Sequence, residues 1–136
     1  MQHSKILIIE DDQDVADSIQ LLCKDMGHDA LVAYDGATGL QMAISEKPEL
    51  ILSDIAMPGL DGFEVARRIR ANHDLDKTAI VAVTGTLPRR PAKNQHTFDD
   101  YVIKPFEVDE LEKVIKKYMA ETSADKPDMG ESAVQS

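Results

Sequence analysis

Polar side chains stand directly after four apolar stretches of this 136-residue chain. They are the carboxylates of Glu10, Asp11 and Asp54, the hydroxyl of Thr84 and the ammonium of Lys104. Ligand sites of open α/β sheets lie outside the carboxyl ends of parallel strands, so this placement predicts a shared site. A plainer interpretation of each acid is that it caps the helix that follows.

The three acids predict a cation site. Carboxylates gathered in one place repel one another and raise each other's pKa unless a cation neutralises them. Mg2+ is a hard cation that takes carboxylate oxygens together with water and phosphate oxygens, so we expect Mg2+ as the cofactor. Lys104 could pair with Asp54 and bind an incoming phosphoryl oxygen. Together with the hydroxyl of Thr84, these groups favour phosphoryl chemistry.

Apolar strands alternate with amphipathic helices along the chain. The expected strands cover residues 5–9, 30–34, 50–53, 79–83 and 100–103, and the expected helices cover 13–27, 37–45, 63–71 and the residues from Val108 onward. In the second helix, Leu40, Ala43 and Ile44 are expected to face the core. Right-handed crossovers between parallel strands place helices on both faces of a sheet. The predicted fold is therefore a three-layer, doubly wound α/β fold, whose five-stranded parallel sheet has the flavodoxin-like order 2-1-3-4-5.

One domain is predicted, over residues 1–120. Apolar periodicity stops at Glu121, and the residues 121–136 are rich in Ser, Asp, Gly and Pro, so we expect them to be a disordered acidic tail. Pro88 and Pro91 interrupt the segment between the fourth and fifth strands, so its helix, the fourth of the fold, is expected to be shortened or irregular.

Composition limits the possible partners and compartments. The formal net charge of −10 argues against direct contact with nucleic acid. No apolar stretch approaches the roughly 20 residues needed to span a membrane, so we expect no membrane contact. Cys23 is the only cysteine, which excludes an intrachain disulfide and suits a reducing compartment. We therefore expect a cytoplasmic protein.

The residues at the strand ends resemble a known signalling family. The chain is similar, over about residues 4–120, to the receiver domain of two-component response regulators, including the chemotaxis response regulator. The matching residues agree in type and spacing, and they are the pair Glu10-Asp11, Asp54 before Ile-Ala-Met-Pro-Gly, Thr84, and Lys104-Pro105-Phe106.

The resemblance implies a role for the acids. Asp54 would be the phosphoacceptor, a carboxylate nucleophile toward a phosphohistidine of a sensor histidine kinase or a histidine phosphotransfer protein. Mg2+ would be held by Asp11, Asp54 and the backbone carbonyl of Ala56, with Glu10 acting through water.

The resemblance also implies roles for residues at the fourth and fifth strands. Lys104 would neutralise charge on the transferring group. Thr84 would hydrogen-bond a phosphoryl oxygen, and Tyr101, at the family's switch-aromatic position, would swing inward. An ordinary edge-strand tyrosine is the alternative for Tyr101. Pro105 is a candidate for a cis peptide bond.

The output surface would consist of the helix before residue 100, the strand 100–103 and the final helix. Its downstream protein target is unknown, and we expect a monomer or a weak phosphorylation-dependent dimer. Thr97-Phe98 stands where the family commonly has Gly-Ala, and the interval between Thr84 and Lys104 is short, which predicts an unusual output face.

Several functions share this fold. The leading hypothesis is a stand-alone receiver without an output domain, favoured by the start at Met1, which catalyses only its own phosphorylation and dephosphorylation. The alternative is the receiver segment of a hybrid histidine kinase. A flavodoxin-like electron carrier is disfavoured because acids, not a phosphate loop, follow the first strand. A metal-dependent phosphatase would need a second acid at Ala56, and the intact acid set argues against a phosphorylation-independent interaction module.

Overall fold

The apolar stretches of the chain form a five-stranded parallel sheet. The structure is a computed structural model that describes residues 4–85 and 97–124. The strands are β1 (Lys5–Ile9), β2 (Asp29–Ala33), β3 (Leu50–Ser53), β4 (Ala79–Thr84) and β5 (Asp100–Ile103). Their order across the sheet is β2-β1-β3-β4-β5, which confirms the predicted topology.

Four α-helices lie within the described residues and connect or follow the strands. They are α1 (Gln13–Asp25), α2 (Gly36–Glu46), α3 (Gly62–Arg70) and α4 (Val108–Ala124), with a short 3-10 helix, η1 (His73–Leu75), after α3. An aspartate caps each of the first three helices: Asp12, Asp35 and Asp61 accept hydrogen bonds from backbone N–H groups of the first turn. A side-chain oxygen at this position satisfies N–H groups that have no partner within the helix.

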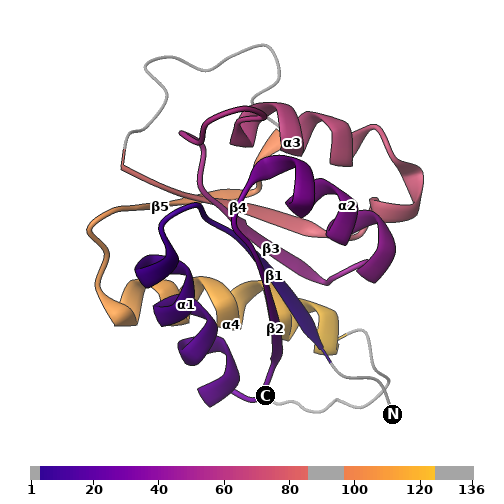
Figure 1. Ribbon diagram of the computed structural model, residues 1–136. Coiled ribbons are helices and arrows are strands. Elements are labelled where there is room, and N and C mark those ends of the chain that lie inside the picture. The colour runs from indigo at the N-terminus through magenta and orange to yellow at the C-terminus, as the bar shows by residue number, and fades with distance from the viewer. Residues whose placement is uncertain (1–3, 86–96, 125–136) are drawn as a thin grey trace.

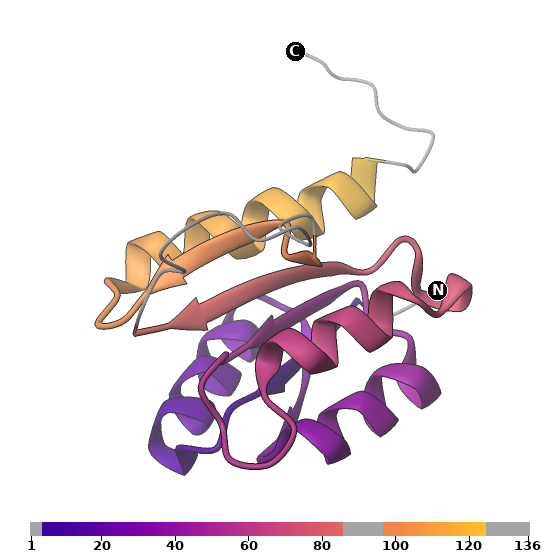
Figure 2. The same cartoon turned by 90° about the horizontal axis from the view of Figure 1, so that it is seen from above.

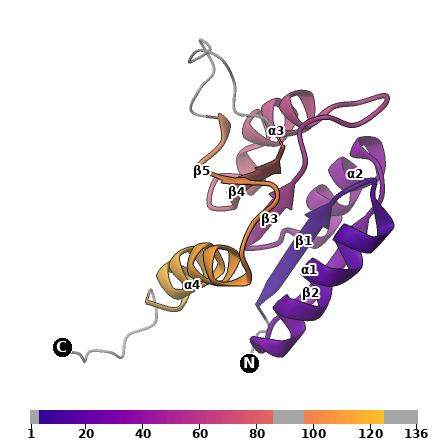
Figure 3. The same ribbon diagram turned by 90° about the vertical axis from the view of Figure 1, so that its left-hand side faces the viewer.

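Helices cover both faces of the sheet, as Figure 1 shows. Helices α1 and α4 lie on one face, and α2 and α3 on the other (Figure 3). Figure 2 shows α4 and α3 separated by the strands. Because side chains alternate along a strand, Ile6 and Ile8 pack toward α1 and α4, while Leu7 and Ile9 pack toward α2 and α3. Both faces are therefore buried, as the unbroken apolar runs predict.

The register of the sheet brings the polar strand ends to one edge. Ile9 pairs with Ser53, so the residues that follow them, Glu10 and Asp54, emerge next to each other. The N–H of Asp54 donates to the carbonyl of Ile9 at 2.9 Å. At the other side of the sheet, the N–H of Lys104 donates to the carbonyl of Thr84 at 2.8 Å.

Two details differ from the sequence-based expectations. Ile44 was expected to face the core but is 46% exposed, because the buried stripe of α2 runs through Gly36, Gly39 and Ala43, and the next residue points about 100° away. Residues 121–124, expected in the tail, belong to α4. Residues 121–124 contain neither glycine nor proline, so nothing in the sequence ends the helix at Glu121.

Two expectations fall on other parts of the chain. The irregular helix expected between the fourth and fifth strands was placed in the segment of Pro88 and Pro91, and the rest of the predicted tail covers 125–136. Both lie outside the described residues. Among the helices that are described, none has the length and apolar character that crossing a membrane requires.

Phe98 joins α3 to the start of β5. Its ring is 5% exposed and lies with its centroid 5.6 Å from that of Phe63 and 5.6 Å from that of Tyr101. We expect Phe98→Ala to lower the free energy of unfolding by about 3–5 kcal/mol, because it leaves a cavity between the aromatic rings of Phe63 and Tyr101. Urea unfolding followed by circular dichroism measures this.

The control for this substitution is Val108→Ala, at a side chain that is 57% exposed. It is expected to change the unfolding free energy by less than about 0.5 kcal/mol. A loss below about 1 kcal/mol for Phe98→Ala would contradict a tightly packed aromatic cluster.

Candidate metal and phosphoryl site

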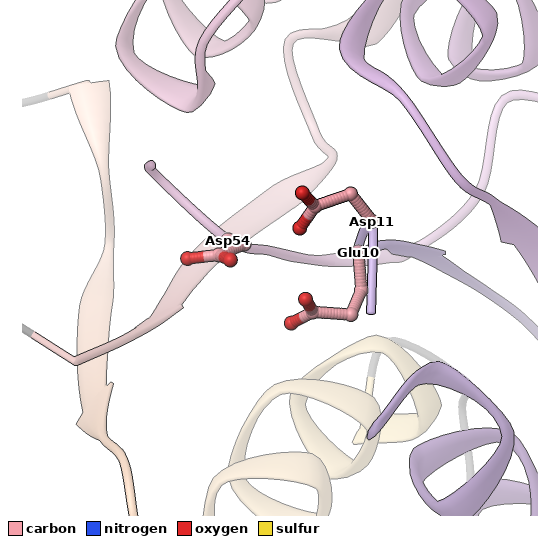
Figure 4. A group of neighbouring side chains, drawn as sticks. All are labelled: Glu10, Asp11 and Asp54. Atoms are coloured by element: carbon pink, nitrogen blue, oxygen red, sulfur yellow. The ribbon is translucent and has the colours of Figure 1, made fainter. Parts of the chain in front are cut away.

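Three carboxylates meet at the carboxyl ends of β1 and β3. Carboxylate oxygens of Glu10, Asp11 and Asp54 all lie within 4.8 Å of one another. Figure 4 shows the three side chains extending from neighbouring strand ends into the same region. Glu10 and Asp54 are buried, with 2% and 7% of their surfaces exposed, whereas Asp11 is exposed to solvent. The sequence-predicted acids are therefore brought together, with one of them accessible from outside.

Lys104 connects two of these acids. Its Nζ lies 2.7 Å from Oε1 of Glu10 and 3.3 Å from Oδ2 of Asp54. The sequence predicts the pair with Asp54, and the structure adds a shorter contact with Glu10. The ammonium is thus shared between two buried carboxylates.

The electrostatics of the cluster perturb both Glu10 and Lys104. Burial raises the pKa of Glu10, and the nearby charge of Asp54 adds to this, although hydrogen bonds from Lys104 and the Asp12 N–H oppose it. Burial alone would lower the pKa of Lys104, but its hydrogen bonds and charge interactions with Glu10 and Asp54 raise it above the ordinary value. The ammonium therefore stays protonated because the acids hold it.

Backbone groups fix the two buried acids. The N–H of Asp12 donates to Oε2 of Glu10 at 3.1 Å, and the N–H of Ile55 donates to Oδ1 of Asp54 at 2.7 Å. Ser53, which the sequence analysis did not single out, donates from Oγ to the backbone carbonyl of Asp54 at 2.9 Å. A serine at the last position of an otherwise apolar strand was the available signal.

The other predicted site residues lie at or near the same edge. Thr84 ends β4 and is 2% exposed. Ala56 is exposed in the connection between β3 and α3. Tyr101 is half-buried in β5 and packs against Phe98. The peptide bond between Lys104 and Pro105 is cis.

A pocket opens beside Lys104, between α1 and the connection from β5 to α4. Its volume is about 500 Å³. The lining residues are Asp14, Val15, Ser18, Lys104, Pro105 and Phe106. A group bound near Lys104 therefore has open space next to it.

The donor set fits a hard divalent cation. Three carboxylates from adjacent strand ends supply oxygen atoms, and one of them is solvent-exposed and can exchange ligands with water. One ammonium shared by two of the acids leaves the cluster with net negative charge. Oxygen ligands with excess negative charge are those that Mg2+ prefers.

The fold and the site define a protein family. The chain matches the response regulator receiver domain family over residues 6–116, and it belongs to that family. This confirms the resemblance seen in the sequence. The acids after β1 also distinguish the chain from a flavin carrier, which would bind phosphate there.

Individual relatives support the same conclusion. Response regulator ArlR of Staphylococcus saprophyticus is 38% identical over 108 residues, which cover 79% of this chain and 49% of ArlR. The chain spans about half the length of the curated relatives that it matches.

Two solved structures share the fold. Response regulator TrrA of Thermotoga maritima, in complex with Mg2+-BeF, is 29% identical with a TM-score of 0.76, covering 85% of this chain and 98% of TrrA. The receiver domain of sensor histidine kinase PA1611 of Pseudomonas aeruginosa, with a magnesium ion in its active-site cleft, is 26% identical with a TM-score of 0.78, covering 88% and 99% of the two chains.

The raised pKa of Glu10 predicts how stability depends on pH in metal-free protein. A carboxyl whose pKa is higher in the folded state binds more protons there, so its contribution to stability is largest below the unfolded value and falls as pH rises through the folded value. Glu10→Gln removes this loss. In EDTA, we therefore expect the unfolding free energy of the variant to rise relative to that of wild type between pH 4 and pH 7.

Urea unfolding at the two pH values measures the difference. Glu110→Gln, at an exposed acid of α4, serves as the matched control and should show no such change. If the difference in unfolding free energy between Glu10→Gln and wild type were the same at both pH values, the raised pKa of Glu10 would be contradicted.

Proposed function

We propose that Asp54 accepts a phosphoryl group from a phosphohistidine of a sensor histidine kinase or a histidine phosphotransfer protein. The observation that carries this proposal is the position of Asp54, which lies between two further acids and the ammonium of Lys104 at the end of a buried strand. A carboxylate in such a place is both a nucleophile and a part of a cation site.

In the transfer, a carboxylate oxygen of Asp54 forms a bond to phosphorus while the bond between phosphorus and the histidine nitrogen breaks. The bonding electrons leave with the imidazole, which is neutral once it holds one proton, and the product is an acyl phosphate on Asp54. Lys104, within 3.3 Å of Asp54, is placed to bind an oxygen of the arriving group.

Asp11, Asp54 and the carbonyl of Ala56 would hold Mg2+, with Glu10 acting through water. When bound, the ion supplies positive charge that offsets the charge on the phosphoryl oxygens. The chain's own part is to hold the acids in place, and the buried Glu10 and Asp54 do this through hydrogen bonds from backbone N–H groups.

The phosphoryl group would act on the output surface through Thr84 and Tyr101. Thr84 ends β4, and Tyr101 lies in the adjacent β5, where its ring packs against Phe98 on the α3 side of the sheet. A bound group shifts such an equilibrium only by its different affinity for the two arrangements. We propose that the output surface binds a downstream protein when Asp54 is phosphorylated.

The chain's proposed activity is limited to its own phosphorylation and dephosphorylation. Ala56 places a methyl group at the position where a phosphatase of free substrates would need a second acid. We further propose a cytoplasmic protein that is a monomer or a weak phosphorylation-dependent dimer.

Two arrangements of the whole protein fit this function. The first is a stand-alone receiver. The second is the receiver part of a longer regulator or of a hybrid histidine kinase, and two observations favour it: the match covers about half the length of the curated relatives, and one similar structure is the receiver domain of a sensor histidine kinase. The chemistry at Asp54 is the same in both.

Incubation with acetyl phosphate tests the proposal. We expect wild-type protein to gain the mass of one phosphoryl group in the presence of Mg2+ and not in EDTA, as measured by intact mass spectrometry. Asp54→Asn should gain none, because it lacks the nucleophilic carboxylate. Lys104→Met should react on the order of 100-fold more slowly, because it lacks the positive charge.

Asp61→Asn is the matched control. Asp61 is exposed and lies at the end of the connection from β3 to α3 that begins with Asp54. Asparagine can cap α3 as aspartate does. The variant should react like wild type. An equal mass gain in Asp54→Asn would place the acceptor elsewhere.

A further inference from the structure

The connection from β3 to α3 carries both Asp54 and Ala56, and a glycine contacts it at each end. Gly62 begins α3 and lies against the backbone of Asp54 and Ile55. Gly36 begins α2 and lies against the carbonyl of Leu60. The connection is thus held between the first residues of two helices.

Gly62 has no room for a side chain. A methyl group there would overlap the carbonyl oxygen of Asp54 and lie 2.7 Å from the Cα of Ile55. The N–H of Gly62 also donates to the carbonyl of Ile55 at 2.8 Å, which fixes the same close approach. Because the atoms it would strike belong to the backbone, they could move only with the phosphoacceptor itself.

Gly36 makes the equivalent contact at the far end of the connection. A methyl group there would overlap the carbonyl oxygen of Leu60 and lie 3.0 Å from Cγ2 of Val65. Neither Gly36 nor Gly62 has a positive φ; among the described glycines that conformation occurs at Gly27 and Gly59. Close approach, and not backbone conformation, therefore requires glycine at these two positions.

The backbone of Asp54 is held tightly by its other contacts. Its N–H donates to Ile9 at 2.9 Å, and its carbonyl accepts from Oγ of Ser53 at 2.9 Å. A displacement forced at Gly62 would therefore break one of these bonds or rotate the carboxylate away from Lys104 and Asp11. Displacements of about 1 Å in a reacting group can cost on the order of 100-fold in rate.

We propose that Gly62 and Gly36 are positioning residues for the phosphoacceptor, which act by letting α3 and α2 contact the backbone that carries Asp54. This inference rests on the proposed function of Asp54. Gly62 acts directly on Asp54, and Gly36 acts through Leu60 at the distal end of the connection.

The test compares Gly62→Ala and Gly36→Ala with wild type and with Ala43→Gly. Ala43 is fully buried in α2, the helix that Gly36 begins. Ala43→Gly therefore destabilises α2 while leaving both glycine contacts in place. Three quantities are measured: the Mg2+ dissociation constant by isothermal titration calorimetry, the rate of phosphorylation by acetyl phosphate at saturating Mg2+, and the unfolding free energy.

We expect Gly62→Ala to weaken Mg2+ binding by about tenfold or more and to slow phosphorylation by a similar or larger factor. Gly36→Ala should change both in the same direction by a smaller factor. Ala43→Gly should lose stability while its folded form keeps the wild-type dissociation constant and rate, because its effect is on folding alone.

Folded glycine variants that bind Mg2+ and react within about twofold of wild type would overturn the inference. If Gly62→Ala does not fold, the same criterion applied to Gly36→Ala decides. Wild-type protein that neither binds Mg2+ nor accepts a phosphoryl group would instead overturn the proposed function, and with it the inference that rests on it.

Discussion

Repulsion among three carboxylates is the constraint on which this structure depends. Glu10, Asp11 and Asp54 would separate if they were on mobile segments, because each charge raises the cost of the next. Two of them are buried, which removes the screening that water would supply. Lys104 offsets part of this cost by bonding to both buried acids. The proximity of the three carboxylates is therefore electrostatically unfavourable, and only a rigid scaffold can maintain it.

The scaffold is rigid because two apolar layers clamp the sheet that carries the acids. Strands β1 and β3 are buried on both faces, so a shift of either strand would disrupt close packing against the helices on both sides of the sheet. The register then delivers Glu10 and Asp54 to adjacent positions, and backbone N–H groups fix their carboxylates. The packing of the core thus holds the like-charged carboxylates together at the carboxyl end of the sheet.

The sequence was sufficient to predict that the three acids and Lys104 come together, because each apolar run ends sharply at a polar residue. The sequence was insufficient where the length and direction of a side chain determine which partner it contacts, as in the shorter contact of Lys104 with Glu10. It also failed for Ile44, where two adjacent apolar residues compete for one buried stripe and the phase of the helix selects Ala43. The close approaches of Gly36 and Gly62 could not be predicted, since they depend on how two helices dock against one connection.

The shared ammonium links the cation site to the proposed phosphoryl chemistry. Lys104 cannot turn fully toward a phosphoryl oxygen while it is needed to balance both Glu10 and Asp54. Positive charge placed among the acids would relieve this demand, since it would offset the same carboxylates. The proposed requirement for Mg2+ would then follow from the distribution of charge around one lysine, and not only from the presence of three acids. The pocket that Lys104 lines would then give its ammonium room to contact an incoming phosphoryl group.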